Sequence, residues 1–232
     1  MQTLIIIPTY NEIENLQRLI GEIFLILPET DILIVDDNSP DGTAELAERL
    51  ARKNHRIKLI RRAGKSGLGS AYIRGFKYAL KNNYDFVFEM DADFSHPPAY
   101  LPDFLMHTSR YNLILGSRYI KGGGITNWGI WRRLLSYAAN LYARIFLGLP
   151  YRDLTGGFKC YSREVLKNLR LDSIISEGYV FQIETTYRAH RQGYAIKEIP
   201  IVFKGRYKGE SKISRKICLE AIWKVPLLRF LR

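Results

Sequence analysis

Two carboxylates separated by a single residue follow an apolar run near the middle of the chain. In the stretch FVFEMDADFSHPP, five residues typical of a buried strand lead directly into Asp91 and Asp93. Like charges at this spacing repel, and burying them unpaired costs several kcal/mol. Side chains at positions i and i+2 of an extended chain share a face. The spacing therefore favours a site for Mg²⁺ or Mn²⁺, which bind carboxylates together with water and phosphate oxygens; the alternative is a solvated turn.

The segments that must position these carboxylates alternate between two patterns. Short, nearly continuous apolar runs, typical of strands buried on both faces, cover residues 4–8, 32–37, 57–60, 86–91 and 113–117. Apolar residues at helical spacing fill the intervals between these runs. The alternation predicts an α/β fold, with a mainly parallel, twisted sheet flanked by helices.

Ligands of such sheets bind beyond the carboxyl ends of the strands. The predicted ends carry PTYNE, DDNSPDG, DADFSHPP and GSRY, so three of them hold acids and the fourth holds an arginine. Another loop, GKSGLGSAY at residues 64–72, lacks the glycines that a P-loop or a dinucleotide-binding fingerprint requires. We expect it to form a tight helix entry. His55, His107 and His190 show no paired metal spacing and are expected at the surface or in turns.

Composition limits the class of protein. The chain has 232 residues, 47% of them hydrophobic, which is enough for one domain with a full core. Its two cysteines, Cys160 and Cys218, form no C-x-x-C motif and suit a reducing compartment. No signal-peptide pattern and no apolar run of 18 residues is visible. These features predict a cytoplasmic protein without a membrane span of its own.

The net charge of +12 calls for an anionic partner, and nucleic acid, phospholipid and phosphorylated small molecules are all candidates. The last 29 residues hold nine lysines and arginines against two glutamates. From residue 213 on, apolar residues at helical spacing stand among these cations: Ile213, Ile217, Ala221, Ile222, Val225 and Leu228. Residues 213–232 are therefore predicted to form a basic amphipathic helix in the headgroup region of an anionic membrane, with a kink or stop at Pro226.

A second amphipathic segment lies in a stretch that has no acidic residue. Its apolar positions follow an i, i+3, i+4 pattern: Trp131, Leu134, Leu135, Ala138, Leu141, Tyr142 and Ile145. Arg132, Ser136 and Asn140 form a separate polar stripe on the same helix. We expect most of the apolar face to belong to the core.

Eight segments occur in an order that carries a family resemblance: IIIPTYNEIENL, IVDDNSPDGT, GLGSAYIRGF, MDADFSHPP, GSRY, DLTGGFKCYSREVL, EGYVFQIE and YKGESK. Together they resemble family 2 inverting glycosyltransferases, and among these the dolichyl-phosphate mannosyltransferases. The resemblance covers residues 4–212 and implies a GT-A catalytic domain at residues 1–212. It also implies transfer of mannose from GDP-mannose to a polyprenyl phosphate.

The resemblance assigns roles to individual positions. The family's nucleotide-sugar-binding positions fall on Pro8, Tyr10, Glu12, Val35, Asp37, Asp91, Ala92, Asp93, Arg118, Arg206 and Lys212. Asp93 matches the direct metal ligand of the D-x-D motif, and Asp91 its partner. Ser95 stands where some relatives have Gln, so the resemblance makes it a candidate metal ligand, directly or through water. The positions implied for phosphate binding and catalysis are Asp93, Arg118, Arg132, Ser136, Arg206 and Lys212.

Two alternatives remain at the level of the sequence. The first keeps the chemistry and changes the donor, for example to UDP-glucose. The second is a basic nucleic-acid-binding module, which is disfavoured because the cations lie downstream of acidic strand ends and no nucleic-acid-binding signature is present. The segment GRYKGESK, residues 205–212, is predicted to act as a lid that closes on the phosphates. The expected partners are thus the nucleotide sugar, the lipid phosphate and an anionic membrane surface on its cytoplasmic face, and not nucleic acid.

Overall fold

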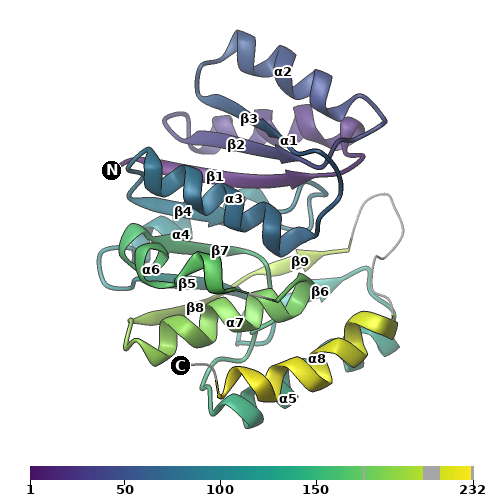
Figure 1. Cartoon of the computed structure of the whole chain (residues 1–232), viewed down its shortest axis with the longest axis vertical. Helices are drawn as coiled ribbons and strands as arrows, with labels where there is room; N and C mark the ends of the chain where they lie inside the picture. The colour runs from purple at the N-terminus through teal and green to yellow at the C-terminus, as the bar shows by residue number, and fades with distance from the viewer. Residues whose placement is uncertain (175, 206–214, 231–232) are drawn as a thin grey trace.

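The computed structural model describes residues 1–174, 176–205 and 215–230, with side chains in the last range from Ile222 onward. Within these residues a seven-stranded sheet has the order β3-β2-β1-β4-β7-β5-β8, and β6 pairs with β9 (Figure 1). The strands are β1 (Thr3–Thr9), β2 (Asp31–Asp36), β3 (Ile57–Arg61), β4 (Phe86–Glu89), β5 (Leu113–Ser117), β6 (Gly124–Thr126), β7 (Lys159–Ser162), β8 (Ile196–Pro200) and β9 (Val202–Lys204). The α-helices are α1 (Ile13–Ile26), α2 (Thr43–Lys53), α3 (Leu68–Lys81), α4 (Leu101–His107), α5 (Ile130–Leu147), α6 (Arg163–Asn168), α7 (Gly178–Arg191) and α8 (Arg215–Leu228).

The five strands predicted from apolar runs are confirmed, and all five run in the same direction. β1 pairs in parallel with both β2 and β4, and β5 is parallel to β8. The exception in the sheet is β7, which lies antiparallel between β4 and β5. The predicted sheet, mainly parallel and flanked by helices, is therefore the one observed.

β7 was not predicted from the sequence, because it begins with a charged residue and so lacks a continuous apolar run. Lys159 is buried and stands opposite Glu89 of β4 in the antiparallel register. Its ammonium donates to the main-chain oxygen of Gln182 at 2.6 Å and to Thr186 Oγ1 at 3.0 Å, both on α7. Burial lowers the pKa of Lys159 to about 8, and burial likewise raises the pKa of Glu89 to about 8. A buried lysine with these partners fixes α7 on the sheet.

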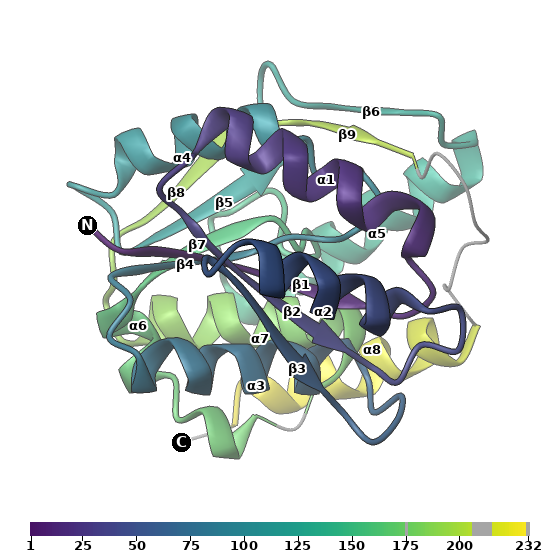
Figure 2. The ribbon, with the colours of Figure 1, turned by 90° about the horizontal axis from the view of Figure 1, so that it is seen from above.

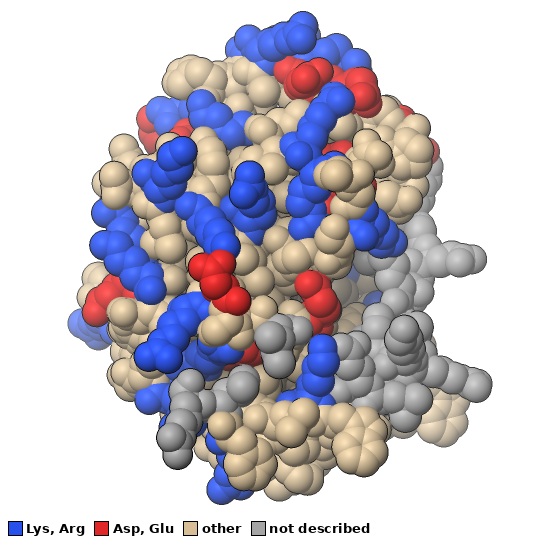
Figure 3. Space-filling view, in the orientation of Figure 1, with Lys and Arg blue, Asp and Glu red and all other residues tan. Residues whose placement is uncertain are grey.

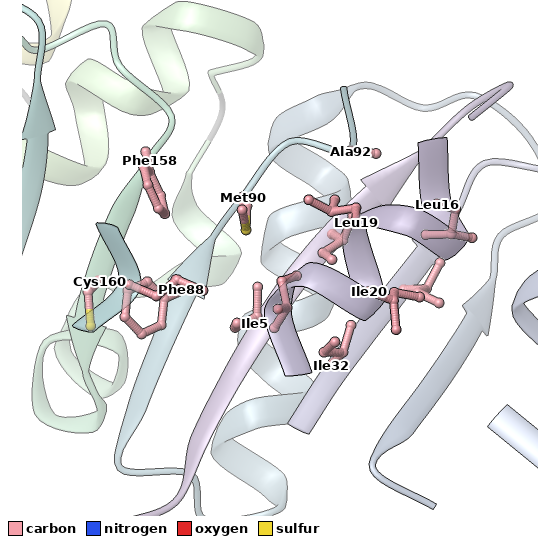
Figure 4. Packing of buried hydrophobic residues seen from close by; sticks show 14 of the residues in the cluster. Ile5, Leu16, Leu19, Ile20, Ile32, Phe88, Met90, Ala92, Phe158 and Cys160 are labelled. Atoms are coloured by element: carbon pink, nitrogen blue, oxygen red, sulfur yellow. The ribbon is translucent and has the colours of Figure 1, made fainter. Parts of the chain in front are cut away.

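Helices cover both faces of the sheet, as the view from above shows (Figure 2). Successive residues of β1 point to opposite faces: Ile5 packs with Leu16 and Leu19 of α1, whereas Ile6 packs with Phe76 of α3. Figure 4 shows the first of these clusters, with the α1 side chains above the strands. The sheet is thereby buried on both sides, and its carboxyl edge remains for a ligand.

A third cluster joins α5, α7 and α8 at one end of the sheet, where α5 and α8 lie side by side (Figure 1). Its buried side chains are Ala143, Leu147, Leu149, Leu154, Val180, Ile183, Tyr187, Val225 and Leu228. Val225 and Leu228 thus face the protein, while Ile222, assigned to the same apolar face in the sequence, is exposed. From Ile222 to Leu228, the part of α8 whose side chains are described, one side packs on the domain and the other is exposed.

The expectation that the apolar face of α5 belongs to the core is wrong. Trp131 is 81% exposed, whereas Asn140 of the polar stripe is 2% exposed. We call the following exposed side chains of α5, of α8 and of the turn after α8 the apolar surface: Ile130, Trp131, Leu134, Leu135, Tyr137, Leu141, Ile145, Phe146, Ile222, Trp223, Leu227 and Phe230. In Figure 3 the lower edge, where α5 and α8 lie, is largely free of charge, whereas lysines and arginines spread over the front.

Pro226 does not end α8, which continues to Leu228. Proline has no amide hydrogen, so the carbonyl of Ile222, one turn earlier, loses its helical donor. The hydroxyl of Tyr142 on α5 donates to this carbonyl at 2.7 Å. The hydrogen bond ties the two helices together at the point where α8 is weakest. Within the described residues, no helix is long and apolar enough to cross a membrane.

Candidate active site

The loops after β1, β2, β4 and β5 lie at one edge of the sheet, as their parallel directions require. The register places Pro8 opposite Val35 and Thr9 opposite Asp36 at this edge. Val35 is fully buried among core side chains, and Ala92 is likewise packed against the other cluster. The side chains of Val35 and Ala92 therefore pack in the core and offer no polar group to a ligand.

The two aspartates of the DDNSPDG loop have different roles. Asp36 is buried and accepts hydrogen bonds from Thr9 Oγ1 at 2.8 Å and from both the main chain and the hydroxyl of Ser39. Those bonds hold the loop after β2 against the loop after β1. Asp37, the residue matched to nucleotide binding, is the next residue along the chain and is 8% exposed.

Asp37 already has a cationic partner, Arg62, which sequence reasoning missed. Arg62 Nε and Nη2 donate to the two carboxylate oxygens at 2.5 and 2.9 Å, and Nη1 donates to Ser70 Oγ at 2.8 Å. Its position two residues after the predicted strand 57–60 was the available signal. Lys65 lies over the ring of Tyr10, with its ammonium 4.5 Å from the ring centre. The GKSGLG loop therefore contacts Tyr10 directly, and it reaches Asp37 through Arg62, whose Nη2 also donates to the Gly67 carbonyl at 3.1 Å.

Asp41 connects the first turns of two helices beside this loop. Its carboxylate accepts from the Thr43 amide at 2.9 Å, from the Thr43 hydroxyl at 2.5 Å and from the Ile13 amide at 3.2 Å. Partial burial alone would raise the pKa of Asp41, but the hydrogen bonds from Thr43 and Ile13 outweigh it and lower the pKa. The charged carboxylate thus holds the start of α1, next to Glu12, against the start of α2.

The D-x-D motif lies in a turn after β4 rather than on an extended strand. The strand ends at Glu89, and Phe94 has a φ of +62°, a strained value for a bulky residue. The argument that the two carboxylates share a face of an extended chain is therefore wrong. Asp93 is 6% exposed and accepts from the Ser95 amide at 3.1 Å, so the turn itself brings the acidic groups and Ser95 together.

Asp91 is held from two sides by buried rings. The hydroxyl of Tyr72 on α3 donates to Asp91 Oδ1 at 3.4 Å, and the Asp91 amide donates to Nδ1 of His96 at 3.1 Å. The His96 ring stacks on Phe158, with 5.0 Å between ring centres. Burial lowers the pKa of His96, which favours the neutral imidazole that this bond requires. His96 was not assigned to the surface with the other three histidines, and its role here is to shape the turn.

Two carboxylates at this turn suit a magnesium-type ion, which binds one or two carboxylates and takes its other ligands from water and phosphate. Ser95 Oγ is buried and has no hydrogen-bond partner among the described residues, so an oxygen ligand is left over beside Asp93. Within the same residues, no group of three or more His, Cys, Asp or Glu side chains could hold a metal. The donor set therefore fits a cation shared with a diphosphate and not a closed structural site.

Arg118, after β5, is buried and paired with an acid that sequence reasoning did not single out. Its Nε and Nη2 donate to the two oxygens of Asp153, each at 2.7 Å, and the Arg118 amide donates to Asp153 at 2.9 Å. Burial alone would lower the pKa of Arg118, but the Asp153 carboxylate raises it. The DLTGG segment that contains Asp153 belongs to the family resemblance, which was the available signal.

A cavity of about 290 Å³ lies beside Arg118, between α5, α7 and α8. It brings together three of the predicted phosphate-binding positions, Arg118, Arg132 and Ser136. The other lining residues are mostly apolar: Trp128, Leu135, Ala138, Ala139, Tyr142, Thr155, Tyr179, Ile183, Ile222 and Val225. The guanidinium of Arg132 lies 4.0 Å from the centre of the Trp128 ring. Arg206 and Lys212, and the predicted lid around them, lie outside the described residues.

A twisted α/β sheet with an acidic turn at its carboxyl edge defines a nucleotide-diphospho-sugar transferase of the GT-A class. The chain belongs to glycosyl transferase family 2, whose family model matches residues 4–170. It is 45% identical over 222 residues to the undecaprenyl-phosphate mannosyltransferase of Micrococcus luteus, covering 96% of this chain and 91% of that protein. It is also 45% identical over 227 residues to the polyprenol monophosphomannose synthase of Mycolicibacterium smegmatis, covering 97% and 85%.

Solved structures agree on the fold. Glucosyl-3-phosphoglycerate synthase from Mycobacterium tuberculosis, in complex with phosphoglyceric acid, superposes with a TM-score of 0.72 at 17% identity, over 100% of this chain and 81% of that one. A mannosyltransferase from Pyrobaculum calidifontis in complex with GDP-Man and Mn²⁺ gives a TM-score of 0.59 at 16% identity, over 90% and 58%. Both support the GT-A architecture, and the chain is a glycosyltransferase.

Proposed function

We propose that this glycosyltransferase transfers mannose from GDP-mannose to a polyprenyl phosphate, with inversion at the sugar carbon and with Mg²⁺ or Mn²⁺ as cofactor. The observation that carries the proposal is the cavity between α5, α7 and α8, where Arg118 and Arg132 stand in a mostly apolar lining. A polyprenyl phosphate has the same combination of an anionic head and an apolar chain. The names of two relatives that are 45% identical point to the same sugar and the same class of acceptor.

The donor is assigned to the sheet edge. Glu12 and Asp37 are suited to the hydroxyl and amine groups of a nucleoside, and Tyr10 offers a ring beside them. Because Arg62 is already paired with Asp37, donor binding must either share this carboxylate or exchange it. Asp91 and Asp93, with Ser95, would hold the cation, which would neutralise charge on the donor diphosphate.

The acceptor needs no strong general base. A phosphate monoester has a second pKa near ~6, so it is largely dianionic at neutral pH and already nucleophilic. One of its oxygens forms a bond to the sugar carbon from the face opposite the diphosphate. The bond from that carbon to the diphosphate breaks, and GDP leaves with the electron pair. Arg118, Arg132 and Ser136 hold the incoming phosphate in line for this displacement. Arg206 and Lys212 are assigned, by the family resemblance alone, to the same group of phosphate-binding cations.

The apolar surface supports a place at the edge of a membrane. Leu135 and Ile222 belong to this surface and also line the cavity, so the two features are continuous. Exposed Arg133 and Arg229 flank the surface and suit anionic headgroups. We therefore propose peripheral binding to the cytoplasmic face of an anionic membrane, through α5 as well as through the predicted helix at residues 213–232.

The test is a donor and acceptor screen with the purified chain. GDP-mannose and UDP-glucose are each incubated with a short prenyl phosphate, with and without Mn²⁺, and the lipid product is identified by mass spectrometry. We expect a mannosyl product that depends on the metal and on GDP-mannose. A glucosyl product from UDP-glucose would replace the donor assignment, and DNA binding without transfer to any prenyl phosphate would contradict the proposal as a whole.

A further inference from the structure

Thr155, in the loop that carries Asp153, has a hydroxyl group whose two acceptor positions are both in use. Arg118 Nη2 donates to Thr155 Oγ1 at 2.8 Å, and Asn140 Nδ2 donates to the same oxygen at 3.0 Å. A hydroxyl oxygen has two lone pairs and one hydrogen. The only hydrogen-bonding capacity that remains on this side chain is therefore its own O–H donor.

The orientation of Asn140 supports this reading. Its Oδ1 accepts from the main-chain amides of Leu154 at 2.7 Å and of Thr155 at 3.1 Å. An amide group turned the other way would present N–H groups to two N–H donors, so the carboxamide can take only this orientation. Nδ2 must then face Thr155 Oγ1 and the Ser136 carbonyl, which it contacts at 2.9 Å. The arginine is fixed in the same way by its two bonds to Asp153.

The side chain that carries this donor lies at the cavity. Thr155 is 7% exposed and lines the cavity together with Arg118 and Arg132. Among the described residues, none accepts the Thr155 hydroxyl hydrogen, and none of the cavity-lining residues is acidic. A buried donor without an acceptor costs free energy, so its retention points to a ligand that supplies one.

We propose that the Thr155 hydroxyl donates a hydrogen bond to a phosphate oxygen of the substrate bound in this cavity. The inference rests on the proposed function and adds a neutral donor to the arginines already assigned. Two sources could supply the oxygen, namely the phosphate of the lipid acceptor and the diphosphate of the donor. Because α5, through Asn140, and the loop after β5, through Arg118, both hold the threonine, its oxygen is positioned before the substrate arrives.

Calorimetry on four forms of the full chain tests the proposal: wild type, Thr155→Val, Thr155→Ser and the control Thr30→Val. Valine keeps the shape of threonine and removes the hydroxyl, while Asp153 still holds Arg118. Serine restores the hydroxyl. Thr30 is an equally buried threonine at the opposite edge of the sheet, where its hydroxyl bonds to the Thr3 carbonyl. Each form is titrated with a short prenyl phosphate, with the matching prenyl alcohol, and with GDP-mannose plus Mn²⁺.

We expect Thr155→Val to weaken binding of the prenyl phosphate by about 10- to 100-fold, the range for a hydrogen bond to a charged group. Affinity for the prenyl alcohol should change by less than about threefold, since the alcohol lacks the anionic oxygen. Thr155→Ser should recover most of the phosphate affinity. An equal loss for alcohol and phosphate would mean a distorted cavity and would overturn the proposal, as would full affinity of Thr155→Val for all three ligands.

The titrations with different ligands also show which substrate supplies the phosphate oxygen. A loss confined to the prenyl phosphate assigns the hydroxyl to the acceptor, and a loss confined to GDP-mannose assigns it to the donor diphosphate. Acceptor titrations need no turnover, so they remain informative if the wild type transfers no mannose. In that case the proposed function fails, while a phosphate-specific effect at Thr155 still stands.

Discussion

Asp93 is the side chain on which metal-dependent donor binding should depend most. Asp93→Asn keeps an oxygen that can accept from the Ser95 amide, so the turn should survive. An amide is a poorer ligand than a carboxylate for a hard cation. We expect turnover to fall by about a hundredfold or more, because a metal contributes several kcal/mol to such a transition state. Calorimetry should show donor binding that no longer changes when Mn²⁺ is added.

Asp103→Asn on α4 provides the matched control. This aspartate is exposed and lies away from the turn, so its loss should change neither turnover nor the effect of Mn²⁺ on donor binding. Metal-dependent turnover at the wild-type rate in Asp93→Asn would remove the D-x-D assignment.

Asp41 gives a pH-dependent contribution to stability. Its pKa is lowered in the folded chain, so the contribution is complete above the ordinary pKa of 3.8 and is lost as the pH falls through the folded value. Asp41→Ala should reduce the free energy of unfolding by about 1 kcal/mol at pH 7, as for other helix-capping residues. Urea titrations at several pH values should show the gap between the two proteins closing below pH 3.8. If the difference in free energy of unfolding between the two proteins does not change with pH, the lost stability does not come from the charge of Asp41.

At the level of elements, the contact between α5 and α8 rests on a hydrogen bond that replaces a missing one. Tyr142→Phe should destabilise α8 by about 1 kcal/mol, because the Ile222 carbonyl then has no donor. In Pro226→Ala the new amide can donate to that carbonyl within the helix. Adding Tyr142→Phe to Pro226→Ala should therefore cost much less, as hydrogen exchange along α8 can measure. Equal losses in both backgrounds would contradict this account.

The strands and α5 show which features of the fold an apolar sequence pattern can predict. The strands ending at Thr9, Asp36 and Ser117 were predicted because a parallel strand buried on both faces has a continuous apolar run. The pattern in α5 defined two stripes correctly but not which of them faces inward. Periodicity is the same for a helix packed on a core and for one with its apolar side exposed, so only tertiary structure could decide.

Candidate site residues could be predicted where a motif lies at a strand end. Their hydrogen-bond partners could not, where these are distant in sequence. Asp37 and Asp93 are local to their strands, whereas the partners Arg62 and Asp153 lie 25 and 35 residues from the residues they pair with. Thr155 and Tyr72 owe their roles to contacts between different elements. Such contacts cannot be predicted from a single sequence.

For the molecule as a whole, the apolar surface should control membrane binding. Replacing Leu134 and Ile145 together by Glu removes two exposed apolar side chains and adds two negative charges. We expect binding to vesicles rich in anionic lipid to weaken by at least about tenfold, since each such side chain contributes ~1.5–3 kcal/mol when buried. Co-sedimentation with vesicles at several salt concentrations measures this.

Leu25→Glu is the control, because Leu25 is 86% exposed on α1 and lies outside the apolar surface. It should leave vesicle binding unaltered. Binding of the Leu134 and Ile145 double variant at the wild-type level would place the membrane contact elsewhere on the molecule.

Leu135 and Ile222 line the cavity as well as the apolar surface. If this surface lies on a membrane as proposed, the acceptor would reach the cavity by diffusing within the plane of the bilayer. Pulling a prenyl chain out into water would cost ~0.8 kcal/mol per CH₂ group, a barrier that grows with every added unit. If the cavity opens at the bilayer surface as proposed, it would receive only the first units of the chain, and the remainder would stay among the lipids. The rate of encounter should then follow the surface density of the acceptor in the membrane, and chains of very different length should compete as equals.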